Sequence, residues 1–153
     1  MRASTAALIS ALTTLAAAES QAVVLNNCDF SVYIWSVGSE IEDVGELAHN
    51  NAWSQDLVRD PVTGGLAIKI TTEEDGLYNG APQTNFAYTL DPDRVFYDLS
   101  DVFGSPFEGH KVSLDPSDED CESIVWENGS QVSGSEVKSC QPKTDLRLSL
   151  CAQ

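Results

Sequence analysis

Residues 66–71, LAIKIT, alternate Leu and Ile on one side of the chain with Ala, Lys and Thr on the other. This period of two is typical of a half-buried β-strand. The segments SVYIWSV (31–37) and LRLSLC (146–151) have β-branched, aromatic or alternating leucine residues of the same kind. Further short strands are predicted between clusters of Gly, Pro, Asn and Asp, at 22–25, 44–48, 51–57, 85–90, 95–99, 111–115 and 122–126. No window predicts a helix, so the pattern indicates one small all-β domain, an antiparallel sandwich or a flattened barrel with both termini in the sheet.

The composition supports one acidic globular domain. The chain has 153 residues, of which 42% are apolar, and its 8 Lys and Arg stand against 24 Asp and Glu, a formal charge of −16. A negative field repels phosphate backbones and anionic lipid head groups, so we expect no nucleic-acid partner and no membrane partner. A basic host protein or a cationic polysaccharide would be attracted to it. We expect a monomer.

The first segment predicts export. Residues 1–22, MRASTAALISALTTLAAAESQA, contain the basic residue Arg2, then an uncharged run of Ala, Leu, Ile, Ser and Thr, and then small residues. This is the plan of a secretory signal peptide. We predict cleavage after Ala22 or a few residues earlier, a mature domain over 23–153, and an extracellular or cell-wall location. An amphipathic first helix is the alternative, but a β pattern starts directly after this segment.

Export changes the interpretation of the four cysteines, which are Cys28, Cys121, Cys140 and Cys151. An oxidising compartment lets thiols pair, and none of these spacings resembles a zinc site. Two disulfides are therefore expected, and three pairings are possible. We favour Cys28–Cys151, which would join the two ends of the domain, together with Cys121–Cys140, which would close a local acidic loop.

A family resemblance is carried by four segments, VVLNNCDFSVYIWSVG (23–38), GGLAIKIT (64–71), NFAYTLDPDRVFYDLSDVFGSPFEGHKVSLDP (85–116) and LRLSLC (146–151). Together they resemble the fungal Blastomyces yeast-phase-specific protein family. More distantly, the same landmarks in the same order resemble thaumatin-like proteins. That resemblance implies a thaumatin-type β-sandwich in which the first cysteine is bridged to the last, here Cys28 to Cys151.

The resemblance also implies where an acidic cleft would lie. Thaumatin-like proteins carry one Arg and several carboxylates in this cleft, to which β-1,3-glucan binding or hydrolysis is attributed. Asp98 matches one of these aspartates, but Ala87 and Phe103 stand where the family has acidic residues, and Ile70 stands at the Arg position, or Lys69 if the register slips by one. Glycoside hydrolysis normally needs two carboxyl groups, so we expect no catalysis and assign no catalytic residue.

A binding role is therefore preferred. Aromatic rings on a sheet stack against sugars, and Trp53 and Tyr78, near turn signals, are the more exposed candidates. Together with Asp98 and Lys69 they form the predicted ligand-binding set. We predict a non-enzymatic protein of the fungal cell wall or host interface that binds a polysaccharide such as β-glucan, or a protein. A weak or vestigial β-1,3-glucanase or antifungal protein is the first alternative.

Two further motifs carry weaker signals. The acidic segment DPSDEDCE (115–122) could offer oxygen ligands to Ca²⁺, and a secreted effector with a cation-binding loop is the second alternative. Because the segment lacks the glycine and the ligand spacing of an EF-hand loop, we prefer to interpret it as a solvated acidic turn. We predict no metal and no cofactor. Asn128-Gly129-Ser130 is the only N-glycosylation sequon, in a turn-like segment.

Overall fold

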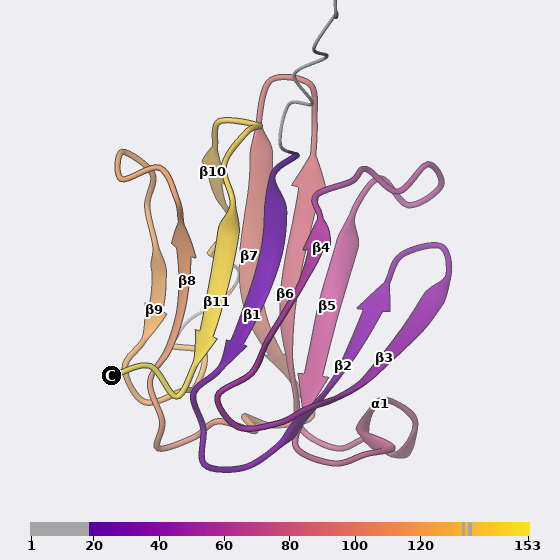
Figure 1. The fold of residues 1–153 in the computed structure, drawn as a ribbon, viewed down its shortest axis with the longest axis vertical. Coiled ribbons are helices and arrows are strands. Elements are labelled where there is room, and N and C mark those ends of the chain that lie inside the picture. The colour runs from indigo at the N-terminus through magenta and orange to yellow at the C-terminus, as the bar shows by residue number, and fades with distance from the viewer. Residues whose placement is uncertain (1–18, 133, 135) are drawn as a thin grey trace, which may run out of the picture.

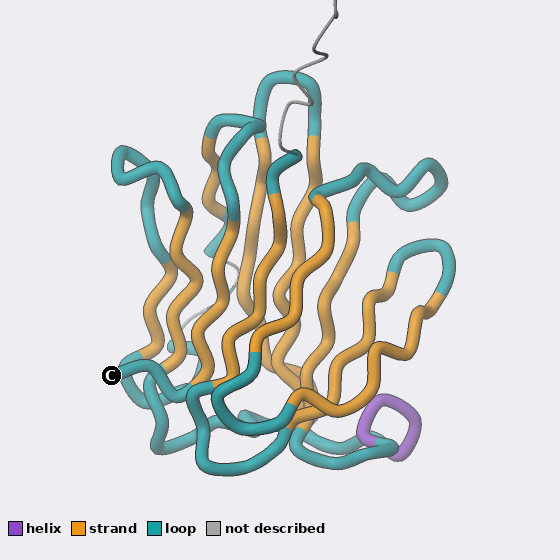
Figure 2. Tube along the Cα trace, viewed as in Figure 1, coloured by secondary structure: helices purple, strands orange, loops and turns teal. Residues whose placement is uncertain are grey.

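The structure is a computed structural model that describes residues 19–132, 134 and 136–153. It consists of two β-sheets that lie face to face (Figure 1). The strands of both sheets run between two loop-rich ends of the molecule (Figure 2). Residues 1–18 of the predicted signal peptide fall outside the described part of the chain.

The first sheet has five strands, in the order β4-β1-β11-β8-β9. These strands are β4 (Ala52–Asp56), β1 (Gln21–Asn26), β11 (Leu146–Leu150), β8 (Val112–Pro116) and β9 (Ile124–Trp126). The second sheet has six strands, in the order β10-β7-β6-β5-β2-β3. These strands are β10 (Lys138–Cys140), β7 (Val95–Val102), β6 (Gln83–Leu90), β5 (Leu66–Thr71), β2 (Val32–Val37) and β3 (Ile41–Leu47).

The all-β sandwich in a single domain is confirmed, and every predicted strand is present within a few residues of its expected bounds. Two described elements were not predicted, the strand β10 and the helix α1 (Gly76–Asn79). Each has only three or four residues, which is too short for a periodic pattern to mark it. No helix in the described ranges has the length and apolar character needed to cross a membrane.

The core lies between the two sheets and follows the predicted alternation. Leu146, Leu148 and Leu150 of β11 face it with no exposed surface, as do Ile68 and Ile70 of β5. Since successive side chains of a strand point to opposite faces, the residues between them lie on the outer faces. The inward place of Ile70 therefore puts Lys69 on the outer face of the six-stranded sheet.

The two ends of the domain meet in the middle of the five-stranded sheet. β1 pairs with β11 in parallel register, from Ala22 opposite Leu146 to Asn26 opposite Leu150, whereas the other strand pairs of the described chain are antiparallel. This parallel pair was not predicted within the otherwise antiparallel sandwich. Cys28, directly after β1, is bonded to Cys151, directly after β11. Cys121 is bonded to Cys140, so both disulfides are the favoured pairs.

Asn26 connects this pairing to the second sheet. Its side chain is fully buried, and its amide nitrogen donates to the carbonyl oxygens of Phe30 and Leu47, at 2.9 Å each. Its amide oxygen accepts the backbone N–H of Cys28 at 3.1 Å. Because both the amide nitrogen and the amide oxygen of this buried side chain are hydrogen-bonded, Asn26 fixes the path of the chain between the end of β1 and the start of β2.

The start of β1 bears on the cleavage site. The backbone N–H of Leu57 donates to Ser20 at 2.7 Å, the N–H of Gln21 donates to Asp145 at 2.9 Å, and Ala22 is fully buried. Cleavage after Ala22 would remove all three features from the mature protein. Cleavage after Ala18 would also follow a run of small residues, as signal-peptide cleavage requires, and it would leave β1 complete.

We predict that the exported protein begins at Glu19, which N-terminal sequencing will show. In refolding experiments, a chain of residues 23–153 should be less stable than one of residues 19–153 by about 2–3 kcal/mol, because two backbone hydrogen bonds and one buried alanine are lost. Urea unfolding measures the difference. A chain that starts at Ser20 lacks only the exposed Glu19 and should match the longer one. Equal stability of all three chains would contradict the assignment.

Candidate functional site

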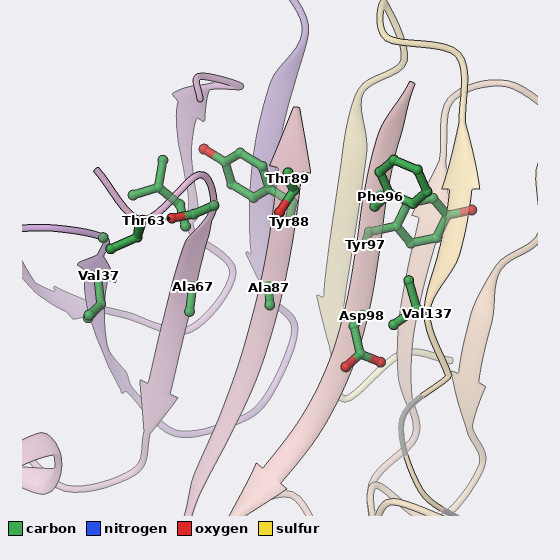
Figure 3. Close-up of a pocket in the computed structure, with 13 residues that line it drawn as sticks. Val37, Thr63, Ala67, Ala87, Tyr88, Thr89, Phe96, Tyr97, Asp98 and Val137 are labelled. Atoms are coloured by element: carbon green, nitrogen blue, oxygen red, sulfur yellow. Dashed lines mark hydrogen bonds between the residues drawn. The ribbon is translucent and has the colours of Figure 1, made fainter. Parts of the chain in front are cut away.

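A groove of about 470 Å³ lies on the outer face of the six-stranded sheet. Its floor is formed by Ala67 of β5 and Ala87 of β6, which are opposite each other in the strand register. Val37 of β2 and Asp98 of β7 continue this row on either side. Figure 3 shows the two alanines between Val37 on one side and Asp98 with Val137 on the other. Because the floor side chains are methyl groups, larger neighbours on both sides rise above them.

One side of the groove is held in place by Asp60. Its carboxylate accepts the backbone N–H and the hydroxyl of Ser39, at 3.0 and 2.7 Å, and the backbone N–H groups of Val62 and Thr63, at 2.9 and 2.7 Å. The residue thereby ties the turn after β2 to the loop before β5. A Cβ on Gly38 would lie 2.6 Å from its carboxylate oxygen, so this close approach requires glycine.

The hydrogen bonds to Asp60 also affect its protonation. The backbone N–H of Ser39 contributes most, followed by that of Thr63 and by the Ser39 hydroxyl, and together they hold the pKa of the carboxyl far below its ordinary value, against the opposing effect of desolvation. Asp60 is therefore charged at neutral and mildly acidic pH, and it contributes stability in that form.

The opposite side of the groove is formed by Phe96 of β7 and by Val137, directly before β10. The backbone N–H of Glu136 donates to Asp98 at 3.1 Å. Lys138 donates to Glu122 at 2.6 Å, and this hydrogen bond is the main reason that the pKa of Glu122 is lowered and that of Lys138 is raised. The Cys121–Cys140 disulfide anchors the same segment.

The groove offers mainly apolar surface with a few polar groups. The Phe96 ring is 36% exposed and the Val137 side chain is 58% exposed, while Thr63 and Thr89 bring hydroxyl groups to its edge. A Cβ on Gly65 would lie 2.6 Å from the Thr89 hydroxyl, so glycine allows β5 and β6 to approach here. Such a lining suits a ligand with apolar ring faces and hydroxyl groups.

The structure places two of the four predicted ligand-binding residues on the strands of this face. Asp98 lines the groove, and Lys69 lies in the next row along the sheet, between Trp35 and Asn85 in the register. Trp53 lies in β4 of the other sheet, where it is partly buried against the core. Tyr78 lies on α1 and is 66% exposed. The register thus places Lys69, and not Ile70, on the face that holds Asp98.

Sequence analysis missed Phe96, Val137 and Ala67 as lining residues. Phe96 precedes the Tyr97-Asp98 pair and alternates with buried neighbours, a signal that marks it as facing outward. Phe103, one of the positions compared with the family cleft, lies in the turn after β7 and is 71% exposed, outside the groove lining. Val137 had no signal, because its segment is brought to β7 by the pairing of the three-residue strand β10 and by the hydrogen bond from Glu136 to Asp98.

The acidic segment 115–122 makes local contacts. Asp115 accepts the Ser113 hydroxyl at 2.7 Å, and Asp118 accepts the backbone N–H of Asp120 at 3.0 Å. Within the described residues, the one group of three potential metal ligands is Asp118 with Cys121 and Cys140. Those two sulfur atoms are bonded to each other and offer no thiolate.

The glycosylation sequon lies at the surface. Asn128 is exposed in the turn directly after β9, where an acceptor side chain is accessible. Its occupancy stays a prediction.

Comparison with known proteins identifies the family. Residues 9–152 match the model of the Blastomyces yeast-phase-specific protein. The chain belongs to the Blastomyces yeast-phase-specific protein family. Among relatives of this member, the antigenic thaumatin-like protein of Arthroderma benhamiae is 34% identical over 146 residues, which cover 84% of this chain and 69% of that protein. The secreted thaumatin-like protein calA of Emericella nidulans is 30% identical over 111 residues, which cover 69% of this chain and 61% of that protein.

Solved structures show that this family member has the thaumatin-like fold. The protein elicitor MoHrip2 from Magnaporthe oryzae superposes with a TM-score of 0.73 at 24% identity, over 87% of this chain and 99% of that chain. The thaumatin-like xylanase inhibitor TLXI superposes with a TM-score of 0.59 at 16% identity, over 85% of this chain and 98% of that chain. The predicted thaumatin-type sandwich is confirmed.

We predict that Asp60→Asn lowers the urea midpoint of unfolding at pH 7, because the neutral amide loses the charge-assisted hydrogen bonds. The pKa of Asp60 is depressed in the folded state, so its contribution is complete above the unfolded-state value of about 3.9 and declines as the pH falls below it. The difference between the variant and the native protein should therefore shrink at about pH 3.

The exposed Asp93, in the turn between β6 and β7, provides the control, and Asp93→Asn should leave the midpoint unchanged at both pH values. A difference for Asp60→Asn that is equally large at both pH values would show that the effect is not the carboxylate charge.

Proposed function

We propose that this protein is exported and acts as a non-enzymatic binding protein of the cell wall or host interface, with a polysaccharide held in the groove on its outer face. A signal-peptide pattern at residues 1–22 and a relative named as secreted support export. The groove is the binding site because it combines an open apolar floor with polar groups at its edges.

One observation carries the non-enzymatic part of this proposal. Among the residues that line the groove, Asp98 is the one carboxylate, and Ala87 lies directly opposite it in the register. Retaining and inverting glycoside hydrolases use two carboxyl groups that lie about 5–10 Å apart across the scissile bond. Asp98 is in addition engaged by the backbone N–H of Glu136. This arrangement supports holding a sugar chain rather than cutting it.

The groove chemistry fits a glycan. The exposed face of Phe96 offers a surface on which the C–H face of a pyranose ring can stack. Thr63, Thr89 and Asp98 supply hydroxyl and carboxylate groups that fix the orientation of sugar hydroxyls. A neutral polysaccharide such as β-1,3-glucan is the natural first probe, since the negative charge of the protein does not oppose its approach.

A pull-down with insoluble β-1,3-glucan tests the proposal. The native protein should be retained on the polysaccharide, and no reducing sugar should appear in the supernatant. Ala87→Phe fills the floor of the groove and should lower retention roughly tenfold, equal to about 1.4 kcal/mol of binding free energy. Asp98→Asn should weaken retention less, because it keeps a hydrogen-bonding side chain of the same size.

Ala52→Phe is the matched control, since Ala52 is an exposed alanine in β4 of the other sheet. It should bind as the native protein does. Release of sugar that is lost in Asp98→Asn would support a vestigial glucanase instead. Retention that is unchanged in Ala87→Phe would remove the groove as the binding site.

A further inference from the structure

A second surface lies on the same outer face, at the end of the sheet where β2 and β3 meet α1 (Figure 1). Tyr33 and Trp35 are two residues apart in β2 and project to the same side. The exposed Tyr78 ring of α1 packs edge to face against Trp35, with ring centroids 6.5 Å apart. We call Tyr33, Trp35 and Tyr78 the aromatic platform.

Carboxylates surround this platform. Glu46 of β3 lies opposite Tyr33 in the register, and a register shift in β3 puts Asp43 opposite Trp35. Glu74, in the segment before α1, also acts on Tyr33, whose pKa is raised by burial first and then by the charges of Glu46 and Glu74. On β5, the neighbouring strand on the other side, the positively charged Lys69 lies opposite Trp35 in the register. Three negative charges against one positive charge favour a cationic ligand.

The platform also contains a hydrogen-bond donor without a partner. Trp35 is 1% exposed, and its Nε1 atom is buried with no acceptor within hydrogen-bond distance. An unpaired buried donor is costly and uncommon in folded proteins. The indole N–H of Trp35 is therefore an unused donor in the side chain against which the exposed Tyr78 ring packs.

The platform lies beside the groove on the same face of the sheet. Val37, which lines the groove, follows Trp35 by two residues on the same face of β2. From strand spacing, Tyr33 lies about 20 Å from Asp98 across the sheet. A linear polymer that lies on this face therefore passes from the apolar groove to the aromatic platform, and it meets carboxylates at both ends.

We propose that the aromatic platform binds a cationic amino-sugar polymer, namely partly deacetylated chitin, with ring faces against Tyr78 and Tyr33 and ammonium groups beside Glu46, Glu74 and Asp43. The inference deepens the proposed function, since it names the polysaccharide class for the same face. A neutral glucan would leave these carboxylates without a partner, whereas a glucosamine unit supplies an apolar ring face and a positive charge together.

Calorimetric titration with a soluble glucosamine oligosaccharide tests the inference. The native protein should bind it more tightly than the N-acetylated oligosaccharide of equal length, and binding should weaken steeply between low salt and about 0.5 M salt. Tyr78→Ala should lower the affinity roughly tenfold, and Tyr78→Phe, which keeps the ring, should restore it. The double variant Glu46→Gln/Glu74→Gln should lower the affinity to a similar degree and flatten the salt dependence.

Glu119→Gln/Asp120→Asn is the charge-matched control, because both residues are exposed in the loop between β8 and β9 of the other sheet. It should bind as the native protein does. Circular dichroism and thermal melting establish that each variant is folded. Equal losses in the control and in Glu46→Gln/Glu74→Gln would show that net charge alone is responsible, which would overturn the site.

The two binding experiments distinguish failure of this inference from failure of the proposed function. If β-1,3-glucan is retained through the groove but the glucosamine oligosaccharide does not bind, the proposed function stands and this inference fails. If the glucosamine oligosaccharide binds through Tyr78 and β-1,3-glucan is not retained, the inference stands. Binding of polylysine through the platform without binding of either oligosaccharide would identify a basic protein as the partner and overturn the inference.

Discussion

The parallel pairing of β1 with β11 is the constraint on which the rest of this domain depends. It places the first and last described strands side by side in the middle of the five-stranded sheet, where Ala22, Val24, Leu146, Leu148 and Leu150 are fully buried. Pairing strands from opposite ends of a chain carries a large loop-closure entropy, so this contact is costly to form and joins the two ends of the domain. The Cys28–Cys151 disulfide then removes much of the chain entropy that opposes the closure.

The outer face of the six-stranded sheet is free to carry a site because the inner face supplies the core. β5, β6 and β7 alternate buried residues with outward-facing ones. At Ala67 and Ala87 the outward-facing side chains are only methyl groups, so the surface is hollowed there. The groove thus exists because two neighbouring strands carry alanine at the same register, while Asp60 and the segment around Val137 build up its sides. Among its lining residues Asp98 is the one carboxylate, whereas glycoside hydrolysis normally uses two.

One groove-lining residue, Asp98, was singled out from the sequence, and Lys69, also singled out, lies in the next row of the same face. Asp98 and Lys69 were identified through a family resemblance, and strand alternation explains why both lie on one face. Trp53 was selected because it is near a turn, but it lies in the other sheet and packs against the core, since the order of strands in space decides which face an aromatic ring meets. Tyr78 is exposed as expected, and its contact with Trp35 follows from a four-residue helix that no periodicity marks.

Fold class, strand positions and acidic character could be predicted from the amino-acid sequence, because alternation, turn residues and charge are local properties that each segment carries. Three features required the folded molecule: the parallel pairing of β1 with β11, the inward place of Ile70 with Lys69 outward, and the position of Val137 beside Phe96 at the groove. These facts depend on contacts between residues far apart in the chain, whose register is set by the packing of the whole core and by two disulfides.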